Sequence, residues 1–395
     1  MMSDNSMEKT IQEKLEKVPD YRSGNAIRHS LTDILMIALL TFLTNGTTYA
    51  DMRVFAEIHA EELKKFLQLA HGIPSQDTFE HIFAGLNPKA LKSVLREYIG
   101  DIKASAMNSG LGRLIVSLDG KTLCGSGSKC GGKKTKHIVS AFASQLRLVL
   151  GEIATDEKSN EITAIPKLLE MFCQSGMIIT IDAMGTQTDI AEAITGKEAD
   201  YVLSVKKNQP TLFNDISIAM ESIEFQATKV VKAQMKEAGL YERTAEKGHG
   251  RYEIRECYIC SDLTLLSTAQ DWKGIAGFGM IVSKRELLNR PDKNIPTINR
   301  EYFIYSLYST NAKDMLCIKR SHWAIENNLH WSLDVIFRED ASRARLDNAP
   351  ENLNVIRKEV LQLLLADKSV KGSVKSKLYR CSQSLDYALS VAGVK

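Results

Sequence analysis

The sequence predicts an α/β protein in which an all-helical N-terminal domain precedes a core built on a sheet. Three observations support this prediction. Apolar residues recur at helical spacing up to about residue 108. From residue 113, three β-type runs follow one another directly, and two more alternate with helical stretches. A polar segment with strand-like runs, residues 211–300, then precedes another long helix.

The composition is that of an ordinary globular protein and excludes several classes. Hydrophobic residues make up 44% of the 395 residues and the net charge is +3, so a nucleic-acid surface would require local clusters of Lys and Arg. The seven cysteines are scattered, and the lone Cys257/Cys260 pair is interpreted as reduced thiols rather than a zinc site. With no signal-peptide pattern and an apolar run, Ile34–Leu43, shorter than the roughly 20 residues that span a bilayer, we expect a cytoplasmic protein without membrane contact.

Residues 1–108 are predicted to form the helical domain. Ser30 or Thr32 can cap its first strong helix, and Asn45-Gly46 can end it. Helices are expected at Ile34–Leu43 and Tyr49–Leu69, from Ser75, and from Asn87-Pro88. Several short helices suit a DNA-binding module and a packing domain equally well, and both interpretations stay open.

Residues 109–210 are predicted to form the first part of the core. An amphipathic helix, capped by Thr163 with Pro166 in its first turn, and a helix from Gln187 to Thr195 can serve as the crossovers that parallel strands require. The order β-β-β-α-β-α-β is that of a ribonuclease-H-like fold. The strands are expected at Arg113–Leu118, His137–Ala143, Leu146–Ala154, Met177–Ile181 and Tyr201–Val205.

The last helix of that fold is displaced along the chain. We interpret residues 211–300 as a mostly β insertion and residues 301–366 as the final helical part of the core, with a strong helix from about Asn311 to Phe337. Residues 367–395 form a basic C-terminal tail. Contact with the DNA backbone is expected there through Lys371, Lys375, Lys377 and Arg380, although a solvated surface is the alternative.

Asp119 and Asp182 directly follow the first and the fourth strand. These strands lie side by side in the predicted topology, so the two carboxylates meet and repel one another. A divalent cation resolves that conflict, and a few hard oxygen ligands with room for water and phosphate favour Mg²⁺, with Mn²⁺ as a substitute. Either aspartate alone could be a strand-end turn residue; the matching contexts favour a metal site.

Glu326 is the predicted third acid. His322, Glu326, His330 and Asp334 recur every four residues and form a polar stripe on the last helix. At about 100° per residue, Glu326 lies roughly 70° from the centre of the apolar face, whereas Asp334 lies roughly 150° away and points to solvent or another domain. Zinc held by His322, Glu326 and His330 is the alternative, but it gives no role to the two aspartates. The apolar face is set by Ile318, Ile325, Leu329, Leu333 and Ile336.

Six motifs occur in order along the chain, and together they are a much stronger signal than any one of them. Together they resemble the ISAs-type insertion-sequence transposases, the group that includes the H-repeat-associated proteins. The resemblance implies a DDE active site with Asp119, Asp182 and Glu326 as the metal-binding triad. It also implies double-stranded DNA as the partner, both as terminal inverted repeats and as target, and a homodimer in the synaptic complex. The motifs are Ser117–Thr122, Glu157–Ile162, Thr180–Met184, Lys207–Gln209, His249–Arg255 and His322–Trp331.

Further DNA contacts are expected around these motifs. Arg251, Glu253 and Arg255 alternate, so they share one face of a strand and could grip DNA or form a surface ion-pair row. Trp323 and Trp331 are interpreted as packing residues. A nuclease of the same fold without strand transfer and an inactive DNA-binding descendant remain as rival functions. The other candidate DNA contacts are Lys121, Lys206, Lys207, Asn208, Gln209, His249, Arg320, His322 and His330.

Overall fold

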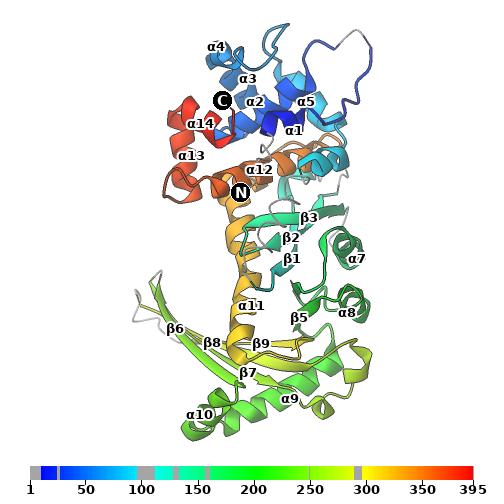
Figure 1. Cartoon of the computed structure of the whole chain (residues 1–395), viewed down its shortest axis with the longest axis vertical. Helices are drawn as coiled ribbons and strands as arrows, with labels where there is room; N and C mark the ends of the chain where they lie inside the picture. The colour runs from blue at the N-terminus through cyan, green and yellow to red at the C-terminus, as the bar shows by residue number, and fades with distance from the viewer. Residues whose placement is uncertain are drawn as a thin grey trace, which may run out of the picture.

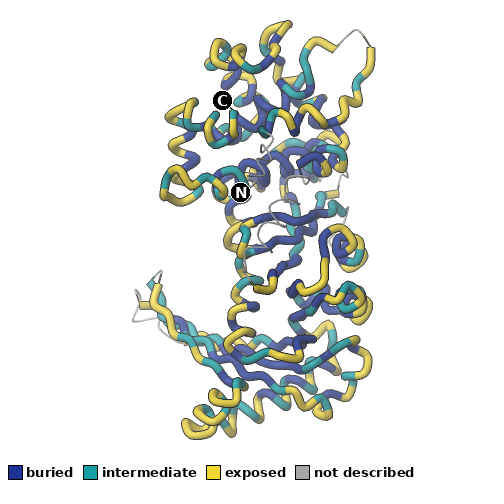
Figure 2. Tube along the Cα trace, viewed as in Figure 1, coloured by how far each residue is buried: buried dark blue, intermediate teal, exposed yellow. Residues whose placement is uncertain are grey.

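The computed structural model describes residues 10–24, 27–95, 112–127, 132, 134–155, 161–248, 250–288 and 296–394. Figure 1 shows three parts stacked along the long axis: a group of helices, the central sheet with its covering helices, and a region formed by β6–β9 with α9 and α10. Buried residues run through the centre of each part (Figure 2). No helix within these ranges is long and apolar enough to cross a membrane.

The helical domain is built from both ends of the chain. Ser30 caps α2, as predicted, by accepting a hydrogen bond from the backbone N–H of Asp33 at 3.0 Å, and Ser75 caps α5 in the same way. The helix predicted over Tyr49–Leu69 is interrupted at His59. The elements from the N-terminal end are α1 (Ile11–Leu15), α2 (Leu31–Leu43), α3 (Tyr49–Ile58), α4 (Ala60–Leu63), α5 (Gln76–Gly85) and a helical stretch over 88–95.

The C-terminal residues are not a tail. They form α12 (Ala349–Ala366), α13 (Val374–Gln383) and α14 (Leu385–Val391), which pack against α2 and α5 in one apolar core (Figure 1). Leu378 and Cys381 of α13 are buried there. Charge alone suggested a solvated segment, but its apolar residues recur at helical spacing and cover α2.

The core has the predicted ribonuclease-H-like order. Strands β1, β2 and β3 form an antiparallel meander, and β1, β4 and β5 are parallel neighbours. Helix α7 (Glu161–Phe172) already includes Glu161, so Thr163 lies inside the helix and does not cap it. Helices α7 and α8 (Thr188–Thr195) pack on one face of the sheet. The strands are β1 (Ile115–Thr122), β2 (His137–Ala143), β3 (Leu148–Thr155), β4 (Ile178–Ile181) and β5 (Asp200–Val205).

The insertion continues the core sheet. It begins with two helices that the sequence analysis did not predict, α9 (Pro210–Gln226) and α10 (Lys229–Glu237). Its last strand, β9, pairs antiparallel with β5, so nine strands form one sheet in the order β3-β2-β1-β4-β5-β9-β8-β7-β6. The inserted strands are β6 (Tyr241–Gly248), β7 (Arg251–Cys260), β8 (Gly277–Leu287) and β9 (Thr297–Tyr305), and short 3-10 turns lie at Cys124–Ser126, Leu263–Leu265, Ala269–Asp271 and Glu339–Ala341.

Helix α11 (Ala312–Ala324) covers the other face of the sheet. Its cap is Asn311, the predicted first residue, which accepts a hydrogen bond from the N–H of Asp314 at 2.9 Å. The helix continues as π-helical turns over Ile325–His330 and Ser332–Ile336, in which the N–H of Trp331 bonds to the carbonyl of Glu326, five residues back. Such wide turns are frequent at functional sites. All five residues of the predicted apolar face are buried.

Candidate active site

The alternation of side chains along β1 and β4 directs polar residues toward α11. Ser117 of β1 donates a hydrogen bond to the carbonyl of Ser321 in α11 at 3.2 Å. Thr180 of β4 lies 2.9 Å from Nδ1 of His322, also in α11. Two residues further along each chain segment, Asp119 and Asp182 have the same parity, so both lie toward the face that α11 covers.

Asp119, Glu326 and His330 form the centre of the site. One ligand atom of each lies within 4.8 Å of the others, and within the described ranges no other group of three or more His, Cys, Asp and Glu residues has this geometry. Nδ1 of His330 is 3.3 Å from Oδ2 of Asp119. The wide turn of the helix therefore presents Glu326 and His330 together to the end of β1.

Asp182 lies near this group but not within it. Its Oδ1 accepts hydrogen bonds from the backbone N–H groups of Met184, at 3.1 Å, and Gly185, at 3.3 Å. Two residues predicted as DNA contacts brace the same loop: Asn208 donates to the carbonyl of Ala183 and Gln209 to that of Thr186. Asn208 and Gln209 thus have a role within the protein, in holding the Asp182 loop.

The electrostatics of the three acids are those of a site that lacks positive charge. Burial raises the pKa of Asp182, and the negative charges of Asp119 and Glu161 raise it further against the opposing N–H groups. Partial burial raises the pKa of Glu326, and the negative charge of Asp119 is the next largest cause. Burial also acts to raise the pKa of Asp119, but His330 reverses this and the net shift is downward. A set of carboxylate oxygens in mutual repulsion fits a hard divalent cation.

The rest of the polar stripe faces the strand ends as well. Burial lowers the pKa of His322 to about 4, and its ring bonds to Thr180, so the structure corrects its assignment as a DNA contact. Asp334 was expected to point away, but its Oδ1 is 2.6 Å from Nζ of Lys121. The wide turns hold more residues than an α-helical turn, so the 100° rule misplaced Asp334.

Lys121 is therefore not a free phosphate contact. Its side chain is only 10% exposed and its ammonium group is surrounded by Asp334, Asp340 at 3.2 Å and Glu339 at 3.6 Å. His330, another predicted DNA contact, is buried against Asp119. Lys206 and Lys207 are exposed at the end of β5, as phosphate contacts require.

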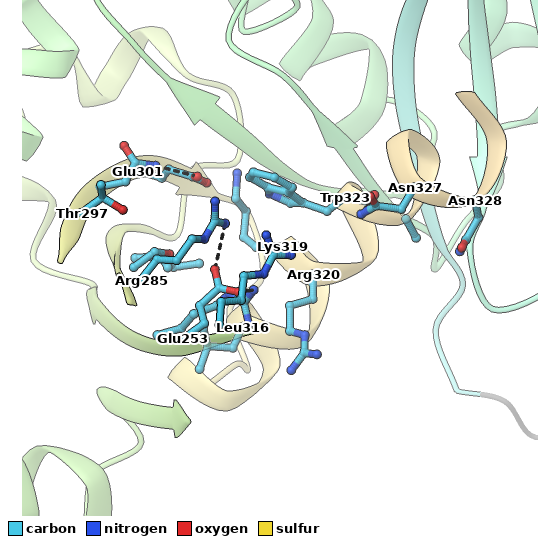
Figure 3. A pocket seen from close by; sticks show the side chains of 16 residues that line it. Glu253, Arg285, Thr297, Glu301, Leu316, Lys319, Arg320, Trp323, Asn327 and Asn328 are labelled. Atoms are coloured by element: carbon cyan, nitrogen blue, oxygen red, sulfur yellow. Dashed lines mark hydrogen bonds and ion pairs between the residues drawn. The ribbon is translucent and has the colours of Figure 1, made fainter. Parts of the chain in front are cut away.

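A basic cavity of about 710 Å³ adjoins the acids, between α11 and the inner surface of β7, β8 and β9 (Figure 3). Trp323, which was interpreted as a packing residue, points into it and is 49% exposed. Trp331 is 50% exposed. Asn327 and Asn328, which follow Glu326, complete the wall nearest the acids. The cavity's five cationic residues are Arg251, Arg255, Arg285, Lys319 and Arg320, and its two acids are Glu253 and Glu301.

Ion pairs hold several of these arginines in place. Glu253 accepts from Arg255 at 2.8 Å and from Arg285 at 3.1 Å, and Glu246 pairs with Arg320. Arg251, Glu253 and Arg255 share one face of β7, as predicted, since all three line the cavity. With five cations against two acids, the lining keeps a positive excess after this pairing. His249 lies outside the described residues.

The C-terminal basic residues divide into two groups. Lys371, Lys375 and Arg380 are exposed. Lys377 is buried, and its ammonium group donates to the carbonyls of Leu364, at 2.9 Å, and Asp367 at the end of α12. The structure therefore corrects the predicted DNA contact of Lys377. The paired residues Glu161 and His137, beside Asp119, were missed, although Glu161 lies within one of the six motifs.

Comparison with known proteins agrees with this geometry. Residues 110–361 match the family described as Transposase DDE domain, and residues 12–99 match the family described as DDE_Tnp_1-associated. The Escherichia coli (strain K12) protein named "H repeat-associated putative transposase YhhI" is 34% identical over 388 residues, 97% of each chain. "H repeat-associated putative transposase YbfD" of the same organism is 33% identical over 252 residues, 64% of this chain and 94% of the relative.

Among solved structures, the chain is similar to a piggyBac transposase synaptic complex with hairpin DNA. The TM-score is 0.40 and the sequences are 10% identical, over 97% of this chain and 77% of the other. The family match, in contrast, covers more than half of the sequence, and the match to YhhI covers 97% of it. The chain therefore belongs to the family of transposases that carry a DDE domain.

Proposed function

We propose that this transposase cuts double-stranded DNA at the ends of an insertion sequence and joins the freed 3′ ends to target DNA. Asp119, Asp182 and Glu326 act as its metal-binding triad. The observation that supports the proposal is the closeness of Asp119, within β1, to Glu326 and His330 on the wide turn after α11, with Asp182 near them after β4. Burial, and after it the negative charge of Asp119, raises the pKa of both Asp182 and Glu326.

The donor set suits Mg²⁺ or Mn²⁺, which Asp119, Asp182 and Glu326 would hold. When bound, such ions activate the attacking oxygen and stabilise the leaving oxygen of a phosphodiester. The protein's own contribution is orientation. His330 fixes the Asp119 carboxylate, the N–H groups of Met184 and Gly185 fix Asp182, and the π-helical turn places Glu326 beside them.

Positive surfaces near the acids support DNA as the substrate. The basic cavity is lined by Asn327 and Asn328, which directly follow Glu326 in the sequence, and Lys206 and Lys207 are exposed at the end of β5. Phosphate neutralisation by Lys and Arg supplies most of the affinity for a DNA backbone. We propose that inverted repeats and target DNA occupy these surfaces in a synaptic complex of two copies, on the bacterial nucleoid.

A cleavage and joining assay tests this function. A labelled duplex that carries the inverted repeats from the gene's own flanks is incubated with Mg²⁺ and a target plasmid. Asp119→Asn, Asp182→Asn and Glu326→Gln should abolish cleavage and still shift the duplex in a gel, while Asp334→Asn, the control on the same stripe, should cut. Nicking that persists in excess EDTA would sink the metal site. Cleaved ends that never join the plasmid would point to a nuclease.

The same assay tests whether Glu326 is the third carboxylate of the triad. Glu326 belongs to the acidic group around Asp119, whereas Asp334 pairs with Lys121. If Glu326→Gln cuts normally and Asp334→Asn does not, Glu326 is the wrong residue.

A further inference from the structure

A buried pair of ionisable side chains lies directly behind the Asp119 strand end. His137, the first residue of β2, is 2% exposed, and Glu161, the first residue of α7, is 6% exposed. A carboxylate oxygen of Glu161 contacts Nε2 of His137. The other ring nitrogen of His137, Nδ1, is 2.9 Å from Oγ1 of Thr122, the residue that faces it across the β1–β2 ladder. Both nitrogens of the ring are thus engaged, and its orientation is fixed.

Gly120 connects this pair to the acidic site. A methyl group at Gly120 would lie 2.3 Å from Nε2 of His137 and 2.4 Å from Oε1 of Glu161, so only glycine allows the pair to press against this backbone. Burial acts to raise the pKa of Asp119, and the N–H of Gly120 is, after His330 and His322, one of the groups that lower it. The pair therefore touches the residue that directly follows Asp119 in β1.

Glu161 also acts on the second aspartate. Its negative charge contributes to the raised pKa of Asp182, after burial and the charge of Asp119. Glu161 consequently lies close enough to influence two of the three acids, although His137 holds its carboxylate outside the group around Asp119. Burying two polar side chains is costly compared with burying an apolar pair of the same size, so core stability alone does not account for this pair.

We propose that Glu161 and His137 form a positioning pair that fixes the Asp119–Gly120 peptide, and thereby the Asp119 carboxylate, for metal binding. The pair gives a role to the motif Glu157–Ile162, of which the structure describes the last two residues. This inference rests on the proposed function of Asp119 as a metal ligand. Neither residue of the pair touches the metal or the DNA.

The test measures metal affinity separately from folding. Mn²⁺ binding to the full-length protein is followed by calorimetry, and the metal requirement of cleavage is titrated. Loss of a partner that orients a metal ligand typically weakens metal binding or activity by about 10- to 100-fold. We expect a loss of this size for Glu161→Gln and for His137→Gln, measured at a temperature at which circular dichroism shows each variant to be folded.

Glu170→Gln is the matched control, because Glu170 lies on the same helix but in an exposed pair with Lys197 at 2.6 Å. A second variant, Gly120→Ala, leaves both members of the pair intact and pushes them away from the peptide, so it should weaken Mn²⁺ binding in the same way. If Glu161→Gln fails to fold, Gly120→Ala and Glu161→Asp supply the comparison.

The outcomes separate the two proposals. Mn²⁺ affinity and cleavage of Glu161→Gln and Gly120→Ala that equal those of Glu170→Gln overturn the positioning pair and leave the triad untouched. Unchanged Mn²⁺ affinity of Asp119→Asn overturns the metal site itself.

Discussion

Nδ1 of His330 lies 3.3 Å from Oδ2 of Asp119, across the interface between the wide turn of α11 and the end of β1. The contact counters the burial that acts to raise the pKa of Asp119, so this carboxylate is kept ionised while Asp182 and Glu326 are shifted the other way. A carboxylate that is already charged and oriented loses little conformational freedom when it binds a metal ion. His330 thus prepares Asp119 for a cation.

Replacing His330 by Ala should raise the Mg²⁺ concentration needed for half-maximal cleavage by about 10- to 100-fold, because Asp119 loses its orienting partner. His330→Gln, which keeps a side-chain donor, should recover part of the loss. A Mg²⁺ titration of DNA cleavage measures both. An unchanged midpoint in His330→Ala, with normal folding by circular dichroism, would contradict this role.

The exposed and the buried basic residues in and just before α13 should behave differently on substitution. Replacing Lys371, Lys375 and Arg380 together by Ala should flatten the salt dependence of DNA binding by about three units of log–log slope, roughly one for each lost phosphate contact. A salt titration of binding to a non-specific duplex measures the slope. The expected weakening is independent of sequence; an identical slope in the triple variant counts against this surface.

Lys377→Ala should act on stability instead. Its ammonium group closes the end of α12 by donating to the carbonyls of Leu364 and Asp367, and their loss leaves buried acceptors unpaired. We expect the free energy of unfolding to fall by about 2–3 kcal/mol with the salt slope unchanged. Urea unfolding measures this, with Lys375→Ala as the control on the same helix. A reduced slope without loss of stability would show that Lys377 meets DNA after all.

Trp323 should contribute to DNA binding through the basic cavity. It is half-exposed, points into the cavity and lies one helical turn before Glu326. Stacking of a base on an aromatic side chain is worth about 1–3 kcal/mol, so Trp323→Ala should weaken binding of the cut end by about tenfold or more, and Trp323→Phe should restore most of it. Trp331→Ala, equally exposed but outside the cavity, is the control. Equal losses for both tryptophans would argue against a specific role of the cavity.

A buried ion-pair network should make the protein sensitive to acid. Glu152 of β3 pairs with Lys92 at 3.0 Å and with Lys358 of α12. These ion pairs join the sheet to the helical domain. Burial acts to raise the pKa of Glu152, but the two ammonium groups outweigh it and lower the pKa from 4.5 to about 2. Because the pKa of Glu152 is lower in the folded than in the unfolded protein, its ion pairs stabilise the fold fully above pH 4.5. This stabilisation is lost as the pH falls toward 2.

Glu152→Gln should therefore remove part of the decline in stability between pH 4.5 and 2. At neutral pH it should destabilise the protein by about 3–5 kcal/mol, because the buried ammonium group of Lys358 loses its carboxylate and that of Lys92 keeps only Glu351. Urea unfolding at a series of pH values measures both effects. Glu61→Gln, in an exposed pair with Lys64, is the control and should change neither. If the free energy of unfolding of Glu152→Gln falls with decreasing pH as steeply as that of the wild type, other carboxylates cause the decline.

The sequence predicted the parts of the fold that depend on periodicity. The β1–β5 order follows from short apolar runs, and the buried face of α11 follows from residues such as Ile325 and Leu329 at helical spacing. Asp182 follows the end of β4, as predicted, but Asp119 lies inside β1, because the strand continues through polar residues to Thr122. The turn of α11 from α to π could not be predicted, since hydrogen bonds five residues apart leave no pattern in residue type, and Asp334 was misplaced for that reason.

Individual polar side chains were the least predictable. Lys377, His322 and Asn208 all sit in stretches that suggest a DNA surface, yet each has a partner within the protein. Residue type tells that a group must hydrogen-bond but not whether its partner is a phosphate or a backbone carbonyl. His137 was missed for the converse reason: it lies within an apolar strand, and nothing near it in sequence marks Glu161 as its partner.

The construction of the helical domain from both ends of the chain constrains its synthesis. The ribosome delivers the whole sheet, with Asp119, Asp182 and Glu326, before it delivers α12, α13 and α14 (residues 349–391), which cover α2. Until those last helices emerge, the apolar surface around Leu39 and Phe42 has no cover from them. A messenger truncated within its final tenth would thus encode every proposed catalytic acid and still yield an aggregation-prone product, because exposed apolar patches of this kind drive association.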